Sequence, residues 1–273
     1  MSAFVSAINV ASLKSGRAIS VSRAEVNERG LAYDREWMAV DALGRFLSQR
    51  DVPRLALIMS RLDNDTSCVW FSAPGMPDLF GAPLVGLLRF PIRVTVHKDS
   101  CDALHCGVLA SEWFSEFLER DVILVRIDPA NPRKHHSSVL DREFPANFQD
   151  GSHALIISRA SLDDFNGRVA ESLPMDRFRP TIEVSGVSPY EEDTWRNKHI
   201  RIGNLEMLGA NLNVRCVVTT IDQETGQRDP RQEPLRTLAT YRRTSDGEVV
   251  FGINCYVIKP GFVNVGDTVE ILS

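Results

Sequence analysis

Short apolar runs alternate with turn residues through the first half of the chain. The runs are rich in β-branched and aromatic residues and have the length of strands, and Gly16, Gly30, Gly44 and the Asn64-Asp65 pair separate them. We expect strands at Ala3–Val10, Ser20–Val26, Trp37–Asp41, Leu55–Ser60, Cys68–Phe71 and Arg93–His97. Their regular spacing predicts a barrel or a sandwich.

Helical periodicity appears in three later segments. One helix is expected near residues 109–118, where the apolar positions are Leu109, Trp113, Phe114, Phe117 and Leu118. A second is expected after Ser158, whose hydroxyl can cap it, with Asp163 and Asp164 near its positive end. A short third helix is expected around Leu235–Ala239.

Strand-like runs return in the C-terminal half of the chain. They are Thr181–Val184, His199–Ile202, Val217–Ile221, Cys255–Ile258 and Val269–Leu272. Between the halves, Asp128–Ser138 is polar and broken by prolines, which predicts a loop. We place a domain boundary upstream of this loop, near residue 120, so that the predicted domains are residues 1–120 and 121–273. The predicted fold class is mainly β with a few helices (α+β).

The composition is that of an ordinary soluble globular protein. Of the 273 residues, 43% are hydrophobic and 25% are charged, and the net charge is −5, so neither nucleic acid nor a membrane is expected as a partner. No segment approaches the roughly 20 apolar residues of a membrane helix, and the N-terminal segment has the wrong order of charge and apolar residues for a secretory signal. The five cysteines are irregularly spaced, which argues against a disulfide framework. We therefore expect a cytoplasmic protein.

Cys216 lies in the sequence NVRCVVTTID, directly after Arg215 and before a β-branched run. A thiolate is a soft metal ligand and a strong nucleophile, and a neighbouring cation lowers its pKa. If a strand has already begun there, Arg215 faces the opposite side. The thiol is thus a packing residue, a nucleophile or a metal ligand, and the residues alone leave these three interpretations open.

Basic residues stand at several expected strand ends. Lys14 follows the first strand together with Ser15, Arg35 precedes the third, and Arg179 precedes a later one. Lysine supplies a point charge and arginine a planar fork for oxyanions, so the functional interpretation is a phosphate pocket. Solvated surface charge is the alternative for each of them. The acidic run Tyr190–Trp195 is expected to be an exposed turn.

Ten stretches together resemble one family over nearly the whole chain. It is the MOSC superfamily, named after the C-terminal domain of molybdenum cofactor sulfurase, in the form with an N-terminal MOSC β-barrel domain, like the mitochondrial amidoxime-reducing component and its bacterial relatives. In order, the stretches are LKSGRAISV, GLAYDREWMAVD, FLSQRDVPRLALI, FQDGSHALIISRASLDDFN, FRPTIEVSG, YEEDTWRNKHIRIG, RCVVTTIDQETG, EPLRTLATYR, FGINCYVIKPG and VNVGDTVEIL.

The resemblance implies a MOSC β-barrel domain packed against an N-terminal MOSC-type β-rich domain. It also implies that Cys216 is the catalytic residue and the protein ligand of molybdenum in a pterin cofactor, the molybdenum cofactor (molybdopterin). Positions that match the family's grip on the pterin phosphate are Lys14, Ser15, Arg35 and Arg179, and stretches that line the cofactor site contain Asp150, Ser152 and Arg215.

The implied activity is reduction of N-hydroxylated compounds, such as hydroxylamines, amidoximes and N-hydroxylated bases, with electrons from a separate donor protein of the ferredoxin or flavoprotein type. The alternative is a cofactor carrier or sulfur relay without reductase turnover. A third interpretation, a degenerate member that binds another anion, follows from departures from the family pattern. These departures are Ala11, Ser12, Thr181, Val214 and Ile253.

Overall fold

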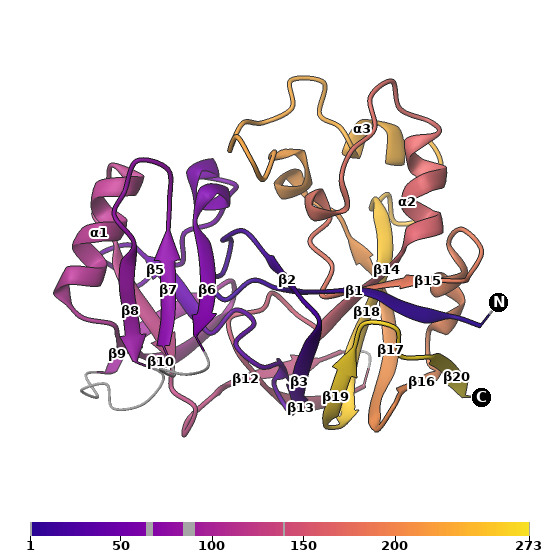
Figure 1. Cartoon of the computed structure of the whole chain (residues 1–273), viewed down its shortest axis with the longest axis horizontal. Helices are drawn as coiled ribbons and strands as arrows, with labels where there is room; N and C mark the ends of the chain where they lie inside the picture. The colour runs from indigo at the N-terminus through magenta and orange to yellow at the C-terminus, as the bar shows by residue number, and fades with distance from the viewer. Residues whose placement is uncertain (1, 64–67, 84–90, 139, 273) are drawn as a thin grey trace.

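The computed structural model describes residues 2–63, 68–83, 91–138 and 140–272 and is built mostly from strands (Figure 1). The predicted class, mainly β with a few helices, is confirmed. Its largest sheet within these ranges has eight strands in the order β2-β1-β15-β14-β18-β17-β16-β20. Their bounds are β1 Phe4–Val10, β2 Ile19–Val21, β14 Ala154–Ser158, β15 Ile182–Ser185, β16 His199–Ile202, β17 Leu205–Val214, β18 Val250–Lys259 and β20 Val269–Leu272.

This sheet is covered on both faces, and its central strand β14 is buried along its whole length. In β14, Ile156 faces the core shared with Met207 and Ile253, whereas Leu155 and Ile157 face a second core on the other side. The alternation follows from the two-residue period of a strand. The two long strands β17 and β18 are neighbours in this sheet and pair antiparallel.

Strands β14 and β15 are parallel, which requires a crossover. The helix α2 (Arg159–Asn166) supplies part of it and packs against both strands. Its N-cap is Ser158, whose side chain accepts a hydrogen bond from the backbone N–H of Ser161, as the sequence predicts. The crossover returns through a 3-10 turn, η2 (Met175–Arg177), so that the segment before β15 lies beside the end of β17.

The first half of the chain forms two smaller sheets around α1 (Val108–Leu118), the helix predicted near 109–118. One sheet has the order β5-β11-β10-β9 and the other β6-β7-β8. Trp37, Phe71 and Phe114 form their core, with Phe71 in edge-to-face contact with both other rings. The strands are β5 Trp37–Val40, β6 Met59–Asp63, β7 Cys68–Ser72, β8 Leu79–Pro83, β9 Pro91–Val96, β10 Asp99–His105 and β11 Ile123–Ile127.

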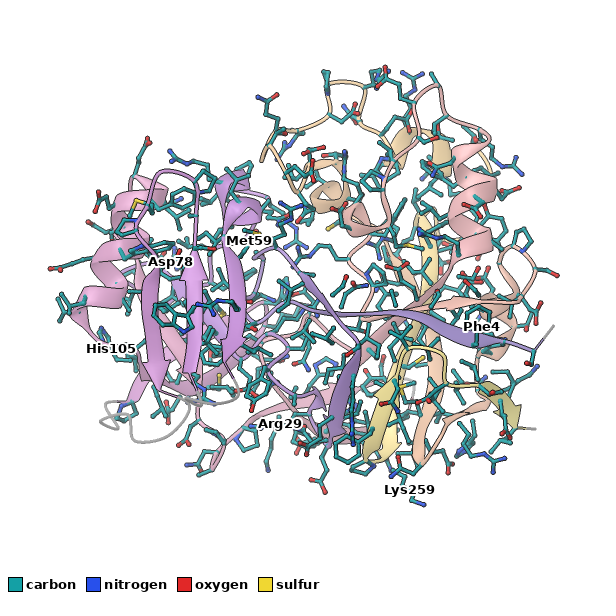
Figure 2. The ribbon with its side chains drawn as sticks, viewed as in Figure 1. Phe4, Arg29, Met59, Asp78, His105 and Lys259 are labelled. Atoms are coloured by element: carbon teal, nitrogen blue, oxygen red, sulfur yellow. The ribbon has the colours of Figure 1, made fainter. Side chains whose placement is uncertain are left out.

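Strand pairing crosses the predicted boundary near residue 120 in both directions. Strands β1 and β2, from the start of the chain, join the large sheet through β15, whereas β11 pairs with β5 and β10. Two small sheets complete the pairing, β12 (Arg133–Ser137) with β13 (Arg142–Ala146), and β19 (Gly261–Asn264) with β3 (Arg23–Asn27) and β4 (Gly30–Leu31). Side chains fill the region between the two groups of strands (Figure 2). The boundary itself stays a prediction.

Three secondary-structure predictions outside the candidate site are wrong in part. The expected strand Ser20–Val26 is divided, because β2 pairs with β1 and β3 pairs with β19 in another sheet. The expected strand Leu55–Ser60 begins as a 3-10 helix, η1 (Pro53–Leu57), with proline in its first turn, and only then becomes β6. The expected loop Asp128–Ser138 contains β12. The side chain of Arg133 in this strand is buried and donates hydrogen bonds to backbone carbonyls.

The third predicted helix is present as α3 (Leu235–Leu238). Within the described residues, none of the helices has the length and apolar character needed to cross a bilayer.

Candidate functional site

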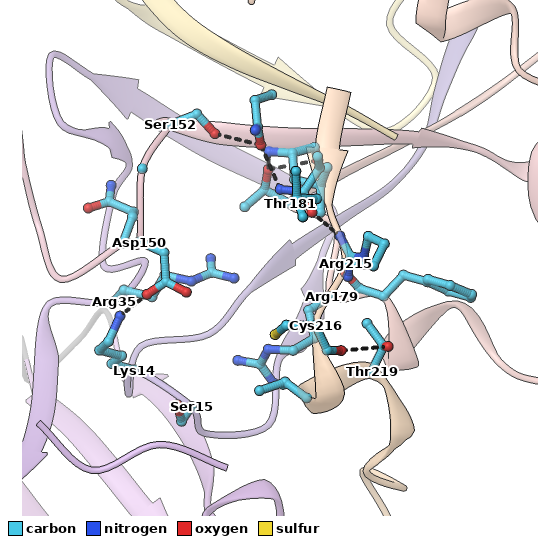
Figure 3. A pocket seen from close by; sticks show the side chains of 18 of the residues that line it. Lys14, Ser15, Arg35, Asp150, Ser152, Arg179, Thr181, Arg215, Cys216 and Thr219 are labelled. Carbon is cyan, nitrogen blue, oxygen red and sulfur yellow. Dashed lines mark hydrogen bonds and ion pairs between the residues drawn. The ribbon is translucent and has the colours of Figure 1, made fainter. Parts of the chain in front are cut away.

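All eight residues singled out from the sequence line one pocket of about 490 Å³. They are Lys14, Ser15, Arg35, Asp150, Ser152, Arg179, Arg215 and Cys216. They come from the loop after β1, the turn before β5, the segment before β14, the turn before β15 and the end of β17. Neighbouring strand ends therefore gather residues that are distant in sequence, and both halves of the chain contribute to the pocket (Figure 3).

Lys14 is the most buried of the lysine and arginine residues that line the pocket, being only 4% exposed. Its Nζ donates a 2.7 Å hydrogen bond to the carbonyl of Phe148 and is paired with Asp150 Oδ1, which also lies 2.9 Å from Nε2 of His97. Burial lowers the pKa of Lys14, and the attraction to Asp150 offsets part of that shift. Burial raises the pKa of Asp150, but the Lys14 charge and the His97 hydrogen bond outweigh it and hold the pKa well below its usual range. The site thus holds an ammonium–carboxylate pair.

Arg35 is also paired with a carboxylate. Its Nη1 donates to Oδ2 of the buried Asp34, whose Oδ1 accepts a 2.9 Å hydrogen bond from the backbone N–H of Ala11. The backbone N–H of Arg35 in turn donates to the carbonyl of Ala11 at 2.8 Å. These contacts fix the arginine against the end of β1.

Four residues of the pocket have left-handed backbone conformations that non-glycine residues seldom adopt. The φ angles are 65° at Ser15, 52° at Arg35, 55° at His97 and 56° at Arg179. Each such residue costs of order 1–3 kcal/mol unless the surroundings hold it, and such residues cluster at functional sites. Their convergence on one pocket is an indication of function that is independent of charge.

Arg179 faces the pocket from the turn before β15 and is oriented by an amide. Its Nη1 donates a 2.9 Å hydrogen bond to Oε1 of Gln223. Burial lowers the pKa of Arg179 to about 10, and the charge of Arg35 adds to that effect. The guanidinium therefore still carries its charge at neutral pH.

A chain of polar side chains forms another wall. Ser152 Oγ donates to Asn254 Oδ1 at 3.0 Å, and Asn213 Nδ2 donates to the same oxygen at 2.7 Å. Arg215 donates through Nη1 to Asn213 Oδ1 and through Nη2 to the carbonyl of Phe178, the latter at 2.7 Å. Burial lowers the pKa of Arg215 to about 10. Its Nε is buried without a hydrogen-bond partner among the described residues.

The segment after Cys216 corrects a sequence prediction. Val217–Ile221 was expected to be a strand, but Val217–Thr220 is a 3-10 turn, η4, with Cys216 as its N-cap. The reason is that Thr219 donates to the carbonyl of Cys216 through both its backbone N–H, at 3.0 Å, and its hydroxyl, at 2.9 Å. The turn ends β17 and directs the sulfur into the pocket (Figure 3).

Among the four cysteines whose side chains the structure describes, Cys101, Cys106 and Cys255 are buried and Cys216 is partly exposed. Burial raises the pKa of Cys106 to about 12 and that of Cys255 further, so neither is a reactive thiolate at neutral pH. Exposure to a polar pocket is not the environment of a packing cysteine. Two interpretations of the Cys216 thiol therefore remain, a nucleophile or a metal ligand.

Three pocket or near-pocket residues were not singled out from the sequence. Arg50 lines the pocket, and its Nη2 lies 3.5 Å from Cys216 Sγ. Gln49 and Gln223 are buried behind the pocket and hydrogen-bonded to each other. All three lie in two of the stretches quoted above, FLSQRDVPRLALI and RCVVTTIDQETG, but nothing in a strand-and-turn pattern shows that these two stretches meet.

The acidic run Tyr190–Trp195 is not an exposed turn throughout. It contains a 3-10 helix, η3 (Glu191–Trp195), in which Glu192 is fully buried. Glu192 Oε1 accepts hydrogen bonds from the Ser158 N–H at 3.0 Å and the Ser161 hydroxyl at 2.7 Å. The carboxylate therefore supports the start of α2, and it is not among the residues that line the described pocket.

Two of the departures from the expected pattern lie in the pocket. The hydroxyl of Thr181 is 2.8 Å from the N–H of Leu155 and 3.1 Å from its carbonyl, so backbone contacts occupy it. Val214 is partly exposed beside Arg215. The other departures are buried residues that do not line the pocket as described, namely Ala11, Ser12 and Ile253.

Comparisons with known proteins agree over both halves. The model of the MOSC N-terminal beta barrel domain matches residues 2–121, and that of the MOSC domain matches residues 143–270. Mitochondrial amidoxime-reducing component 1 of Mus musculus is 33% identical over 277 residues, which are 96% of this chain and 80% of the relative. Mitochondrial amidoxime reducing component 2 of Bos taurus is 34% identical over 281 residues, 97% of this chain and 82% of the relative. Molybdenum cofactor sulfurase of Oryza sativa subsp. japonica is 33% identical over 260 residues, 88% of this chain and 31% of the relative.

Proposed function

The chain belongs to the MOSC-domain family, in the form with an N-terminal MOSC β-barrel domain, and on that premise we propose that it is a molybdenum-cofactor-dependent reductase of N-hydroxylated compounds. The resemblance inferred from ten sequence stretches is confirmed at the level of the family. The proposed substrates are hydroxylamines, amidoximes and N-hydroxylated bases. Electrons would come from a separate donor protein of the ferredoxin or flavoprotein type.

The observation that carries the proposal is one accessible thiol in a pocket lined by five basic side chains. These are Lys14, Arg35, Arg50, Arg179 and Arg215. A thiolate suits a soft-ligated metal, and cations from separate elements suit the phosphate of a pterin cofactor. The residues present therefore fit both the metal and the phosphate of the cofactor.

In this proposal Cys216 supplies the protein ligand to molybdenum. Lys14, Ser15, Arg35 and Arg179 would bind the cofactor's phosphate, and Asp150, Ser152 and Arg215 would line other parts of the cofactor site. The bound cofactor supplies two-electron chemistry, in which an N-hydroxyl group, two electrons and two protons give the N–H compound and water. The protein contributes ligation, anchoring and a polar pocket that orients the substrate.

The short turn after Cys216 contributes to that role. Two hydrogen bonds from Thr219 fix the carbonyl of Cys216, and the backbone N–H of the preceding Arg215 donates to the carbonyl of Val249 at 2.7 Å. Such contacts would hold Cys216 in a fixed orientation as a metal ligand. Arg50, from the N-terminal half, reaches the same sulfur.

The second candidate is a cofactor carrier or sulfur relay without reductase turnover. It is favoured by the match to the rice molybdenum cofactor sulfurase, which covers 88% of this chain at 33% identity. A single accessible thiol could hold the cofactor or pass on sulfur in the same pocket. Both candidates use Cys216 and the basic side chains, so turnover separates them.

The test is a reductase assay on protein made with molybdate in cells that synthesise the cofactor. Reduced methyl viologen serves as the donor, and a hydroxylamine, an amidoxime and an N-hydroxylated base serve as substrates. We expect formation of the reduced products by the wild type and by the control Cys101→Ala, and none by Cys216→Ala. Bound cofactor without turnover of any of the three substrates would contradict the reductase and support the carrier.

The cellular location is part of the proposal as well. We keep the cytoplasm as the predicted location, although the two amidoxime-reducing relatives are mitochondrial by name. Fractionation of the host cells, with detection of the chain itself, tests this directly.

A further inference from the structure

The three cations expected to bind phosphate are oriented by different groups. Lys14 is paired with the carboxylate of Asp150, and Arg35 is paired with the carboxylate of Asp34. Arg179 instead donates to the neutral amide oxygen of Gln223, at 2.9 Å, and forms no ion pair among the described residues. Of these three cations, Arg179 is therefore the one whose charge no paired carboxylate neutralises.

The amide that orients Arg179 belongs to a buried pair. Gln49 and Gln223 are 0% and 2% exposed, and each donates through Nε2 to the Oε1 of the other, at 3.0 and 3.1 Å. Gln49 Nε2 also donates to the carbonyl of Ser15 at 2.8 Å, and Gln223 Nε2 donates to the carbonyl of Ile221 at 2.9 Å. All four amide hydrogens are used, so the pair is rigid and fully satisfied.

The pair connects both sides of the pocket. Its first member holds the turn that contains Ser15, in the N-terminal half, and its second member holds Arg179, in the C-terminal half. Because 174 positions separate the two glutamines in the sequence, they meet only through the fold. A slip of either turn would break hydrogen bonds in the pair, and because both side chains are buried, their polar atoms would be left unsatisfied.

We propose that Gln49 and Gln223 are positioning residues that hold Arg179 in place without neutralising it, so that Arg179 carries the charge that binds the anionic group of the ligand. A carboxylate at position 223 would orient the guanidinium equally well, but it would form a charge-assisted pair that an incoming oxyanion has to displace. A neutral amide avoids that competition. The inference rests on the proposed function in taking the anion to be a cofactor phosphate.

The test measures binding of inorganic phosphate to the cofactor-free full chain by isothermal titration calorimetry, with thermal unfolding in parallel. We expect Gln223→Glu to weaken phosphate binding about tenfold or more, since a loss of about 1.4 kcal/mol corresponds to tenfold, while the melting temperature is maintained. The matched control Gln227→Glu makes the same chemical change at an exposed position of the same loop and should bind phosphate as the wild type does.

A role through Arg179 is separated from a general structural role by a double-mutant cycle. In an Arg179→Gln background, Gln223→Glu should cause no further loss of phosphate binding. Gln223→Met removes the hydrogen bond to Arg179 and adds no charge. It is measured in both backgrounds as well, so that the role of Gln223 can still be tested if Gln223→Glu folds poorly. Wild-type phosphate binding in Gln223→Glu, or an equal loss with and without Arg179, would overturn the inference.

Failure of this inference and failure of the proposed function give different results. Wild-type protein that purifies with molybdenum but lacks phosphate affinity in its cofactor-free form would overturn the inference and leave the function standing. Phosphate binding that depends on Gln223 through Arg179, in a protein that never acquires molybdenum, would support the inference and overturn the function.

Discussion

Nη2 of Arg50 lies 3.5 Å from Sγ of Cys216, although 166 positions separate the two residues in the sequence. The arginine comes from the loop between β5 and η1, in the N-terminal half, and the cysteine from the end of β17. A hydrogen bond to a metal-ligating sulfur is an outer contact of the kind that tunes and orients a metal site. The N-terminal half therefore contacts the proposed reaction centre itself.

The first prediction concerns that contact. We expect Arg50→Ala to lower kcat/KM for an N-hydroxylated substrate about tenfold or more, since loss of such an outer contact typically costs 10- to 100-fold in activity or metal affinity. Steady-state kinetics of the molybdenum-loaded protein, expressed per bound molybdenum, measure it. The exposed Arg45, five positions earlier, supplies the control Arg45→Ala, which should match the wild type. Unchanged kinetics in Arg50→Ala would contradict a role for this contact.

The second prediction concerns the stability of the Lys14–Asp150 pair as pH falls. The pKa of Asp150 is held well below its ordinary value of 3.8, since burial, which raises it, is outweighed by Lys14 and His97. A carboxyl group with a depressed folded-state pKa stabilises the protein fully above its unfolded-state pKa, and this stabilisation is lost as pH falls through the folded-state pKa. We therefore expect Asp150→Asn to lower the free energy of unfolding at pH 7, with the difference from wild type shrinking below pH 3.8.

Urea unfolding at several pH values between 7 and 2.5 measures this difference. The control is Asp102→Asn, which removes a carboxylate from the exposed pair with Arg93 and should change stability little at any of these pH values. A difference for Asp150→Asn that stays constant or grows as the pH falls is incompatible with the depressed pKa.

The third prediction is that Glu192, in the acidic run Tyr190–Trp195, stabilises the fold and takes no part in ligand binding. Glu192→Ala removes the acceptor for the buried N–H of Ser158 and the hydroxyl of Ser161. Leaving such donors unsatisfied costs about 1–3 kcal/mol, so the free energy of unfolding should fall by this amount while phosphate binding by the folded protein stays unchanged. The neighbouring Glu191→Ala, at an exposed position, should cost much less. Loss of phosphate binding at unchanged stability would place Glu192 in the site after all.

The sequence alone predicted the fold class, and the residues that it singled out line one pocket, whereas several predictions of local backbone were wrong in part. Strand ends with basic residues, and one cysteine after an arginine, were recognisable because charge and thiol chemistry are visible in residue types. Their convergence follows from the β1-β15-β14-β18-β17 order of the large sheet, and a pattern of strands and turns does not specify that order.

What the sequence could not show depends on long-range contacts. The β-branched run after Cys216 favours a strand by propensity, yet the hydrogen bonds of Thr219 turn it into η4. Gln49 and Gln223 are unremarkable as polar residues in loops, and only tertiary packing makes them a buried pair. The composition around Glu192 predicts an exposed turn, whereas its position beside α2 makes it a buried hydrogen-bond acceptor.

The account depends most on Cys216 as the protein ligand of molybdenum, and the measurement that tests this most directly is the molybdenum content of purified protein. Wild type, Cys216→Ala and the buried control Cys101→Ala are produced with molybdate in cells that make the cofactor, and molybdenum is determined per chain by elemental analysis. We predict molybdenum in the wild type and in Cys101→Ala, and little or none in Cys216→Ala, with all three equally folded by circular dichroism. Equal molybdenum in Cys216→Ala and wild type, or none in folded wild type, would contradict the proposal that Cys216 is the protein ligand of molybdenum.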